Sequence, residues 1–208
     1  MTTIYLMRHS EPFKNHKGIE DIRENLLFSN IKSPLSIQGE KLAEKISNNS
    51  EFDNLDDVWS SDYVRAMSTA KYFAAKNNLK VNISDKFGER KHGVNSWDEL
   101  PENFELHQFQ DDKYKIGDGE SQQETKERMK NALDKILNTN KNKITLIVGH
   151  ATSIAFLLTY WCEINYTGPY KFNNKDFYNG EWDYCETFKL IFDDKNNLIS
   201  IENLKFDK

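Results

Sequence analysis

Cysteine is scarce in this sequence, and several other features are missing altogether. The two cysteines, Cys162 and Cys185, form no CxxC pair, so we expect reduced thiols in the core or on the surface. No apolar run approaches the ~18 residues that a membrane-spanning helix needs, and no basic segment precedes the short apolar run at the N-terminus. With 28 basic against 33 acidic residues, the chain has no dominant positive field for nucleic acid. These absences predict a cytosolic protein that binds neither membranes nor nucleic acid.

The length of 208 residues, with 38% hydrophobic residues, is suited to one domain spanning residues 1–208. Short β-rich runs alternate with helical patterns, which predicts an α/β fold: a three-layer sandwich with a mainly parallel central sheet and helices on both faces. The expected strands are 3–7, 56–60, 80–84 and 143–149, followed by a hairpin of 185–192 and 198–206 that turns at 193–197. The expected helices are 36–48, 62–77, 122–138 and 151–162, and Ser121 with Glu124 forms a capping box at the start of the third.

Three stretches match no regular element: 11–33, 86–120 and 163–183. They are polar, contain scattered aromatic residues, and are long for connections within a compact domain. Loops of this length are often functional. We therefore expect residues 86–120, and also 163–183, to form lids over the site.

Two histidines each follow an apolar, strand-like run. His9 comes after Ile4-Tyr5-Leu6-Met7-Arg8, and His150 comes after Ile144-Thr145-Leu146-Ile147-Val148-Gly149. Open α/β sheets build their sites where strands run out into loops. Two imidazoles and the guanidinium of Arg8 at one sheet edge suit a dianionic phosphoryl group, which needs positive charge, fork-shaped donors and a nucleophile. Taken alone, an Arg-His pair after a strand is also compatible with ordinary surface residues.

Two further segments strengthen the phosphoryl hypothesis. Ser61 and Arg65 follow the strand at 56–60 and are one helical turn apart, on the same face at the start of the expected helix. Glu89 follows the strand at 80–84 and offers a carboxyl group in a loop bounded by Gly88 and Gly93.

Taken in order, these motifs resemble the histidine phosphatase superfamily, which includes cofactor-dependent phosphoglycerate mutases and many small phosphatases. The matching signals are Leu6-Met7-Arg8-His9, Asn15, Pro34-Leu35-Ser36 with Gly39, Ser61 through Ala70, Glu89, Gly119-Glu120-Ser121 and Val148-Gly149-His150. They cover about residues 3–156. The resemblance implies a phosphoglycerate mutase-like fold and transfer of a phosphoryl group without metal or organic cofactor.

The resemblance also implies roles for individual residues. His9 matches the phosphorylated nucleophile, and Glu89 matches the proton donor, although some members use a carboxylate elsewhere. The residues that match phosphoryl-binding positions are Arg8, Arg65, His150 and Asn15. We also expect substrate contacts from Ser61 and from His92, which lies three residues past Glu89.

Two departures from the family pattern bear on activity. Ser10 stands where the family has glycine, which can shift the loop slightly, and we expect activity to survive. His16–Glu24 does not match the Arg-containing segment that usually follows the Asn in the family, so we expect that wall of the pocket to differ.

The segment 90–120 favours a phosphatase over a phosphoglycerate mutase. It offers Arg90 and Lys91 but then six acidic residues between Asp98 and Asp112, which make a poor clamp for a second phosphate or a carboxylate. A module that binds phosphate without turnover is a third hypothesis, because Ser10 and Glu89 leave room for lost catalysis.

The remaining candidates have simpler interpretations. His16, His92 and His107 are isolated in polar loops and are expected to be solvated or locally hydrogen-bonded, with His92 the best placed for a substrate. No ligand spacing around His9 or His150 suggests a metal. The expected partner is a small phosphorylated substrate. Its identity is left open, as is the oligomeric state, for which a homodimer is one option.

Overall fold

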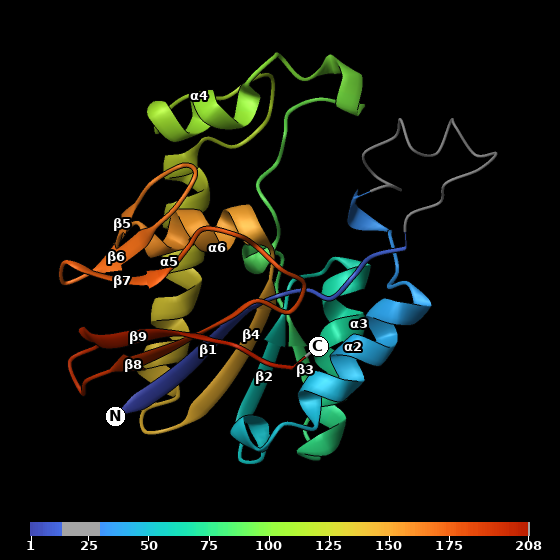
Figure 1. Cartoon of the computed structure of the whole chain (residues 1–208), viewed down its shortest axis with the longest axis vertical. Coiled ribbons are helices and arrows are strands. Elements are labelled where there is room, and N and C mark those ends of the chain that lie inside the picture. Colours follow the sequence, from blue (N-terminus) through green and yellow to red (C-terminus); the bar gives the residue numbers. More distant parts are fainter. Residues whose placement is uncertain (14–29, 208) are drawn as a thin grey trace.

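A six-stranded sheet runs through the centre of the computed structural model, which describes residues 1–13 and 30–207 (Figure 1). Its strand order is β3-β2-β4-β1-β8-β9. The strands are β1 (Thr2–Arg8), β2 (Asp57–Ser60), β3 (Val81–Ile83), β4 (Ile144–Gly149), β8 (Thr187–Phe192) and β9 (Leu198–Leu204). Neighbours from β3 to β1 pair in parallel, whereas β1 with β8 and β8 with β9 are antiparallel. The predicted mainly parallel sheet with a late hairpin is confirmed.

Helices cover both faces of this sheet, as predicted (Figure 1). On one face lie α2 (Ile37–Ser47) and α3 (Val64–Lys76), and on the other lie α5 (Gln122–Thr139) and α6 (Ala151–Leu158). None of the helices in the described part of the chain is long and apolar enough to cross a membrane.

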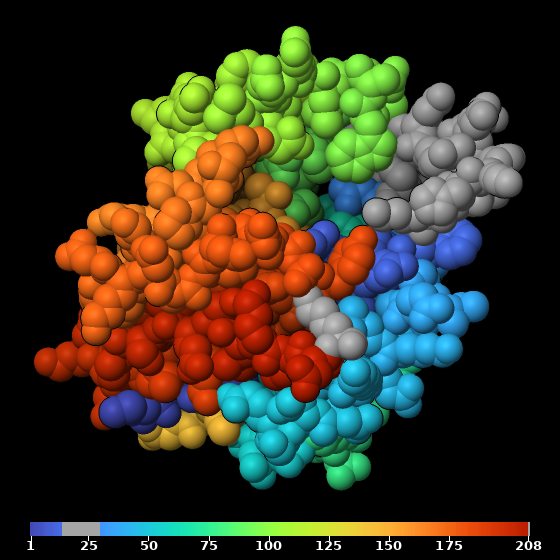
Figure 2. Space-filling view, viewed as in Figure 1, coloured from blue at the N-terminus to red at the C-terminus, as the bar shows by residue number. Residues whose placement is uncertain are grey.

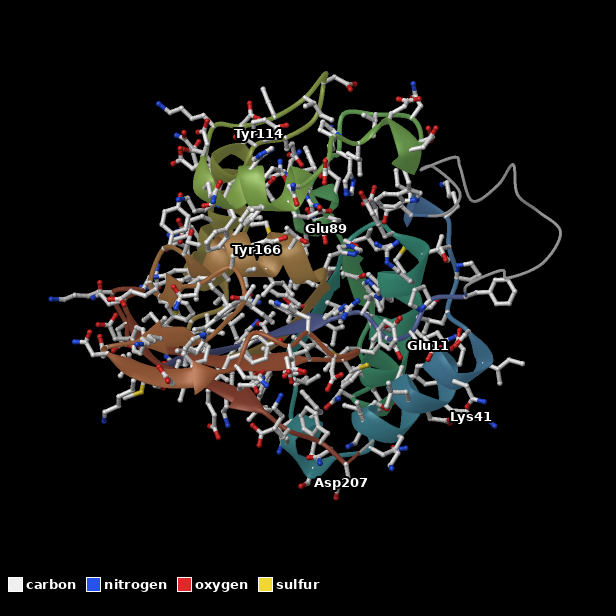
Figure 3. All side chains as sticks on the ribbon, turned by 45° about the horizontal axis from the view of Figure 1, so that its top comes forward. Glu11, Lys41, Glu89, Tyr114, Tyr166 and Asp207 are labelled. Carbon is white, nitrogen blue, oxygen red and sulfur yellow. The ribbon has the colours of Figure 1, made fainter. Side chains whose placement is uncertain are left out.

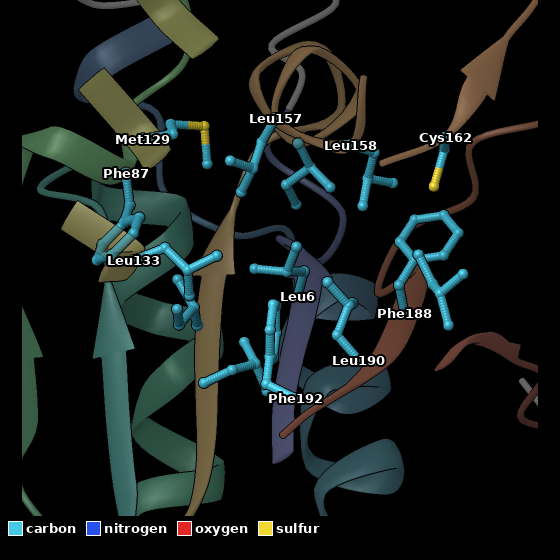
Figure 4. Packing of buried hydrophobic residues seen from close by; sticks show 14 of the residues in the cluster. Leu6, Phe87, Met129, Leu133, Leu157, Leu158, Cys162, Phe188, Leu190 and Phe192 are labelled. Carbon is cyan, nitrogen blue, oxygen red and sulfur yellow. The ribbon is translucent and has the colours of Figure 1, made fainter. Parts of the chain in front are cut away.

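Strand β1 shows why the sheet is covered on both sides. Ile4 and Leu6 pack into the core beneath α5 and α6, whereas Tyr5 and Met7 pack into the core beneath α2 and α3. Side chains alternate between the faces of a strand, so a continuous apolar run fills two cores at once. Figure 4 shows Leu6 in the first of these cores, facing Leu157 of α6.

Two of the three predicted irregular stretches contain regular elements after all, and most of the third, 11–33, lies outside the described residues. Residues 163–183 form a second, antiparallel sheet of β5 (Glu163–Ile164), β6 (Tyr170–Phe172) and β7 (Lys175–Tyr178). Tyr178 is buried, and its ring lies 5.0 Å from that of Phe188 in β8. Tertiary packing of aromatic rings thus stabilises strands that are too short to show a period in the sequence.

The stretch 86–120 likewise holds α4 (Phe104–Gln110) and a 3₁₀ helix at Trp97–Glu99, and 3₁₀ turns also occur at Ser50–Phe52 and Asp85–Phe87. Phe104 anchors α4, because its side chain is almost completely buried. The description of this stretch as irregular was therefore wrong for its middle part.

Two helix boundaries differ from the prediction. Helix α3 begins at Val64, because Tyr63 is its extended N-cap residue. Helix α6 ends at Leu158 rather than 162, since the Thr159 hydroxyl donates to the Phe156 carbonyl oxygen and the next turns tighten to i→i+3 hydrogen bonds. The Ser121 capping box is present as predicted.

Candidate active site

The two strand-end histidines meet at the carboxyl edge of the parallel strands. Arg8 of β1 is in register with Gly149 of β4, and the His9 N–H donates to the Gly149 carbonyl oxygen at 3.0 Å. The His9 and His150 ring centroids are 5.2 Å apart, and both side chains are buried. The structure therefore brings together the two imidazoles that the sequence placed on separate strands.

The hydrogen-bond partners of His9 define its tautomer. Nδ1 lies 2.7 Å from the Ser10 carbonyl oxygen, which can only accept, so Nδ1 carries the proton. Nε2 receives the Nε–H of Arg65 at 2.8 Å, and because a guanidinium can only donate, Nε2 presents a lone pair. Burial lowers the pKa of His9 well below its ordinary value, and the nearby Arg65 charge lowers it further. His9 is thus a neutral imidazole in which Nε2 is the unprotonated nitrogen.

Arg65 connects the two histidines from the first turn of α3. Besides its bond to His9, its Nη2 lies 3.1 Å from Nδ1 of His150. Its terminal nitrogens also donate to the backbone and side-chain oxygens of Asn30. Burial lowers the pKa of Arg65 to about 10, so it still carries a full positive charge at neutral pH.

His150 is completely buried and is supported by Ser61. Its Nε2 lies 2.8 Å from the Ser61 hydroxyl oxygen. Because Nδ1 faces the donor-only Arg65, Nδ1 is the acceptor and Nε2–H donates to Ser61. Burial lowers the pKa of His150 well below 6.5, with the Arg65 charge as the next cause.

The predicted place of Ser61 on the helix was wrong. It precedes the N-cap residue of α3, so it does not share a helical face with Arg65. Its side chain is fully buried against His150, where it can position the imidazole.

Arg8 approaches from the end of β1. Its Nη1 donates to the Trp182 carbonyl oxygen at 2.6 Å, and its guanidinium lies 4.8 Å from the ring centroid of Tyr184. Its Nε is buried and has no hydrogen-bond acceptor within the described ranges 1–13 and 30–207. That N–H is a donor still available to an anion.

Glu89 is held at the N-terminus of α6. Its carboxylate accepts the backbone N–H groups of Ser153 at 2.9 Å and Thr152 at 3.3 Å, and that of Arg90 at 2.9 Å. The first N–H groups of a helix lack partners within the helix and favour a negative group. Figure 3 shows Glu89 between the lid helix α4 and the strand ends, with its side chain partly exposed.

His92 lies further out, within the predicted lid. Its ring is buried, 4.9 Å from that of Trp97, and burial lowers its pKa to about 4. It lines a cavity of about 390 Å³ together with Tyr63 and Asn30, which contact Arg65. The structure thus places His92 beside the site without contact to His9. Asn15 lies outside the described residues.

Ser10 fits its position by making two hydrogen bonds. Its hydroxyl donates to the Gly39 carbonyl oxygen at 2.7 Å, and its N–H donates to the Thr69 hydroxyl at 2.9 Å. A side chain on Gly39 would lie 2.1 Å from the Glu11 carbonyl oxygen, so only glycine fits there. Ser10 therefore connects the nucleophile loop to α2 and α3.

Sequence analysis missed several residues that contact the site. The ring centroids of Tyr184 and His9 are 6.5 Å apart. The Trp182 carbonyl oxygen accepts a hydrogen bond from Arg8, and the Asn30 side-chain oxygen accepts one from Arg65. For Trp182 the sequence signal was the aromatic content of residues 163–183, which we interpreted as a lid, whereas Tyr184 and Asn30 lie outside that stretch and gave no signal.

The assembled groups suit one kind of chemistry. Two guanidinium groups and a helix N-terminus surround a neutral imidazole, and a carboxyl group lies at the rim. Such a site attracts an anion and offers it a nucleophile. Within the described part of the chain, no three His, Cys, Asp or Glu side chains are grouped as metal ligands.

Comparison with known proteins decides the family. The family model described as "Histidine phosphatase superfamily (branch 1)" matches residues 4–194. The chain belongs to the histidine phosphatase superfamily. Among its relatives are phosphoserine phosphatase 1 of Hydrogenobacter thermophilus, 27% identical over 72% of this chain and 71% of that protein, and a probable phosphoglycerate mutase of Salmonella arizonae, 27% identical over 76% and 74%.

Solved structures share the histidine phosphatase fold. A mycobacterial glucosyl-3-phosphoglycerate phosphatase in complex with VO3 has a TM-score of 0.69 at 15% identity, covering 99% of this chain and 98% of that one. A mutant phosphoserine phosphatase of Entamoeba histolytica in complex with phosphoserine has a TM-score of 0.64 at 16% identity, covering 97% of each chain. The expected phosphoglycerate mutase-like fold is confirmed.

Proposed function

We propose that this protein is a metal-independent phosphomonoester hydrolase that works through a phosphohistidine on Nε2 of His9. The observation that carries the proposal is the arrangement around that ring. Nδ1–H is held by the Ser10 carbonyl oxygen, and Nε2 presents its lone pair beside Arg65. A histidine that attacks phosphorus must be neutral, with one nitrogen free and the other held by an acceptor.

In the first half-reaction, the Nε2 lone pair attacks phosphorus and the bond from phosphorus to the ester oxygen breaks. Glu89 gives its proton to the departing oxygen, so an alcohol leaves rather than an alkoxide. This proton donation contributes ~10²–10⁴-fold. In the second half-reaction, Glu89 accepts a proton from water, the water oxygen attacks phosphorus, and the N–P bond breaks to release phosphate and neutral His9.

Arg8, Arg65 and His150 would hold the phosphoryl oxygens during both steps. Charge spreads over three equatorial oxygens in the transition state, so catalysis depends on donors that are already in place. Arg65 is held between the two imidazoles by hydrogen bonds, and the Arg8 Nε–H has no acceptor among the residues that the structure describes.

A mutase is the second candidate, favoured by the relative named as a probable phosphoglycerate mutase. Against it, the lid has little cationic character to grip a second anionic group. Arg90 already pairs with Glu105 at 3.1 Å, and Lys91 is exposed. Phosphate-binding without turnover is the third candidate.

The test is hydrolysis of p-nitrophenyl phosphate with EDTA present, over pH 5–8, by wild type and His9→Ala. His107→Ala is the control, because His107 is an exposed histidine of the lid. We expect EDTA-resistant turnover in wild type and in the control, and none in His9→Ala. Turnover that persists in His9→Ala would mean that another group is the nucleophile.

Trapping the intermediate separates the other two candidates. With a ³²P-labelled monoester, a hydrolase passes the label from the protein to water as phosphate. A mutase passes it to a second hydroxyl compound such as a phosphoglycerate, and a silent binder retains it or is never labelled. Transfer to phosphoglycerate that exceeds release of phosphate would replace our proposal with the mutase.

Several predictions from the sequence accompany this proposal. They are a single domain over residues 1–208 with lids at 86–120 and 163–183, a cytoplasmic location, and a small phosphorylated substrate as the partner. The absence of a metal or organic cofactor also stays a prediction, which the EDTA experiment addresses.

A further inference from the structure

A cavity of about 240 Å³ lies between the two predicted lid segments. Its wall is formed by α4, by the start of α6, and by residues around β5 and β6. Figure 2 shows the surface hollowed between the green lid segment and the orange segment that carries β5–β7. The lining residues are Arg90, Glu105, Gln108, Phe109, Ala151, Thr152, Ala155, Phe156, Tyr166, Tyr170 and Trp182.

Two lining residues join this cavity to the active site. The backbone N–H of Thr152 donates to the Glu89 carboxylate, and the Trp182 carbonyl oxygen receives the Arg8 guanidinium. One wall of the cavity therefore positions the proposed proton donor, and another positions a phosphoryl-binding arginine. The cavity is thus adjacent to the Glu89 carboxylate, which the proposed reaction places beside the ester oxygen.

Five of the eleven lining residues carry aromatic rings. Phe109 of α4 lies 5.5 Å from Tyr166, so that pair spans the two lid segments. Trp182 and Tyr170 lie 6.4 Å apart and are joined by the indole N–H, which donates to the Tyr170 hydroxyl at 3.2 Å. Rings fixed in this way form flat, preorganised surfaces that favour another aromatic ring in edge-on or offset contact.

Two polar atoms in the lining residues have no partner within the part of the chain that the structure describes. They are Nε of Arg90 and Oε1 of Gln108, in side chains that are 4% and 0% exposed. Buried polar atoms in folded proteins are almost always hydrogen-bonded, and a void left by imperfect packing is lined by apolar groups. A donor and an acceptor left unused beside aromatic walls are features of a ligand site.

We propose that this cavity is the subsite for the leaving group, and that it selects phosphomonoesters of aromatic alcohols over those of small aliphatic polyols. The volume is suited to one substituted ring rather than to a large substrate. This inference rests on the proposed function for its biological meaning, but binding of a stable analogue tests it separately.

The experiment compares phenylphosphonate with methylphosphonate by isothermal titration calorimetry. Neither compound has an ester bond to phosphorus, so binding is measured without turnover. We expect phenylphosphonate to bind wild type about 10-fold more tightly, because the ring is removed from water against the aromatic wall. Phe109→Ala and Tyr166→Ala should each reduce that ratio to roughly threefold or less.

Two controls separate a lost subsite from a damaged protein. Inorganic phosphate has no leaving group, so its affinity should be unchanged in both variants. Tyr160→Ala removes a ring that is 42% exposed and outside the cavity lining, and it should keep the wild-type ratio. Tyr166 is itself 49% exposed, so its removal is unlike a core deletion.

Each outcome has a definite meaning. Equal affinities for the two phosphonates in wild type, or a ratio that survives in both variants, would overturn the subsite while leaving phosphatase activity intact. Failure to bind either phosphonate would overturn it as well. Selective binding of phenylphosphonate by a protein that hydrolyses no monoester would retain the subsite and refute the proposed function.

Discussion

Arg65 donates its Nε–H to Nε2 of His9 at 2.8 Å, the same nitrogen that the proposed reaction uses to attack phosphorus. The contact orients the ring in the resting site. When phosphorus approaches Nε2, the Arg65 Nε–H loses this acceptor and has to donate its hydrogen bond to a phosphoryl oxygen instead. Arg65 is therefore expected to contribute more in the transition state than in the substrate complex.

Replacing Arg65 by lysine tests this role. The single ammonium group of lysine cannot reproduce the planar guanidinium, which makes hydrogen bonds to His9, His150 and Asn30 at the same time. We expect kcat for p-nitrophenyl phosphate to fall ~10²–10³-fold, as for loss of one preorganised donor. Steady-state kinetics measure this, with a melting curve to show that the variant folds. A kcat within a few-fold of wild type would mean that Arg65 does not stabilise the transition state.

Ser61→Ala removes the acceptor of the His150 Nε2–H bond. We expect kcat to fall about 10-fold, because one buried hydrogen bond that orients the imidazole is worth roughly 1–1.5 kcal/mol. Ser60→Ala is the matched control, since Ser60 is equally buried but its hydroxyl donates to the Ser61 carbonyl oxygen rather than contacting His150. The same loss in both variants would indicate general destabilisation rather than positioning of His150.

Ser10→Gly restores the residue that the family has after the nucleophile. The substitution removes the hydrogen bond from the Ser10 hydroxyl to the Gly39 carbonyl oxygen, and it raises the conformational entropy of the unfolded chain. We therefore expect the free energy of unfolding to fall by about 1–2 kcal/mol, with activity retained within about threefold. Urea unfolding measures the first quantity. Ser10→Ala should lose only about 1 kcal/mol, and a Ser10→Gly protein as stable as wild type would contradict the account.

His92 should make stability depend on pH. Burial lowers its folded pKa to about 4, below the ordinary 6.5, so the unfolded chain binds a proton that the folded chain does not. The contribution of neutral His92 to the free energy of unfolding is complete above pH 6.5 and is lost as the pH falls toward 4. His9 and His150, whose pKa values are also lowered, act in the same direction.

His92→Gln should therefore flatten part of the loss in unfolding free energy between pH 7 and pH 4.5, measured by urea titration at several pH values. His107→Gln is the control, because that side chain is exposed. An unchanged slope in His92→Gln would show that His92 is protonated as easily in the folded protein as in the unfolded one.

The strands of the six-stranded sheet, most helices and the placement of His9, His150 and Arg65 could be predicted from the sequence, because each lies in or directly after a local apolar pattern. The contacts that complete the site could not. Arg8 meets Trp182 across 174 positions, and Arg65 meets Asn30 across 35. The spacing of apolar residues along a short segment contains no information about such distant pairs, since they depend on how the loops pack against the sheet.

The secondary structure within the two predicted lid segments could not be predicted, for a related reason. Strand β5 has two residues and β6 has three, which is too short for alternation to appear. Asn103 is a residue type favoured at N-caps, but its backbone is left-handed and its side chain makes no cap hydrogen bond, and α4 has only seven residues, which is too short for a clear helical period. These elements are stabilised by aromatic packing rather than by their own propensities.

The register of β1 against β4 has a consequence for how such a site can change. His9 and His150 each follow one residue after the paired Arg8 and Gly149, so their ring separation of 5.2 Å is close to the ~4.8 Å between neighbouring strands. The spacing of the two imidazoles is thus inherited from the repeat distance of the sheet, and no loop has to create it. Loops around the rim are free to lengthen, shorten or change composition while the spacing of the two imidazoles stays constant. If the proposed function holds, the residues that select a substrate can therefore change without altering the spacing of the two histidines on which the reaction depends.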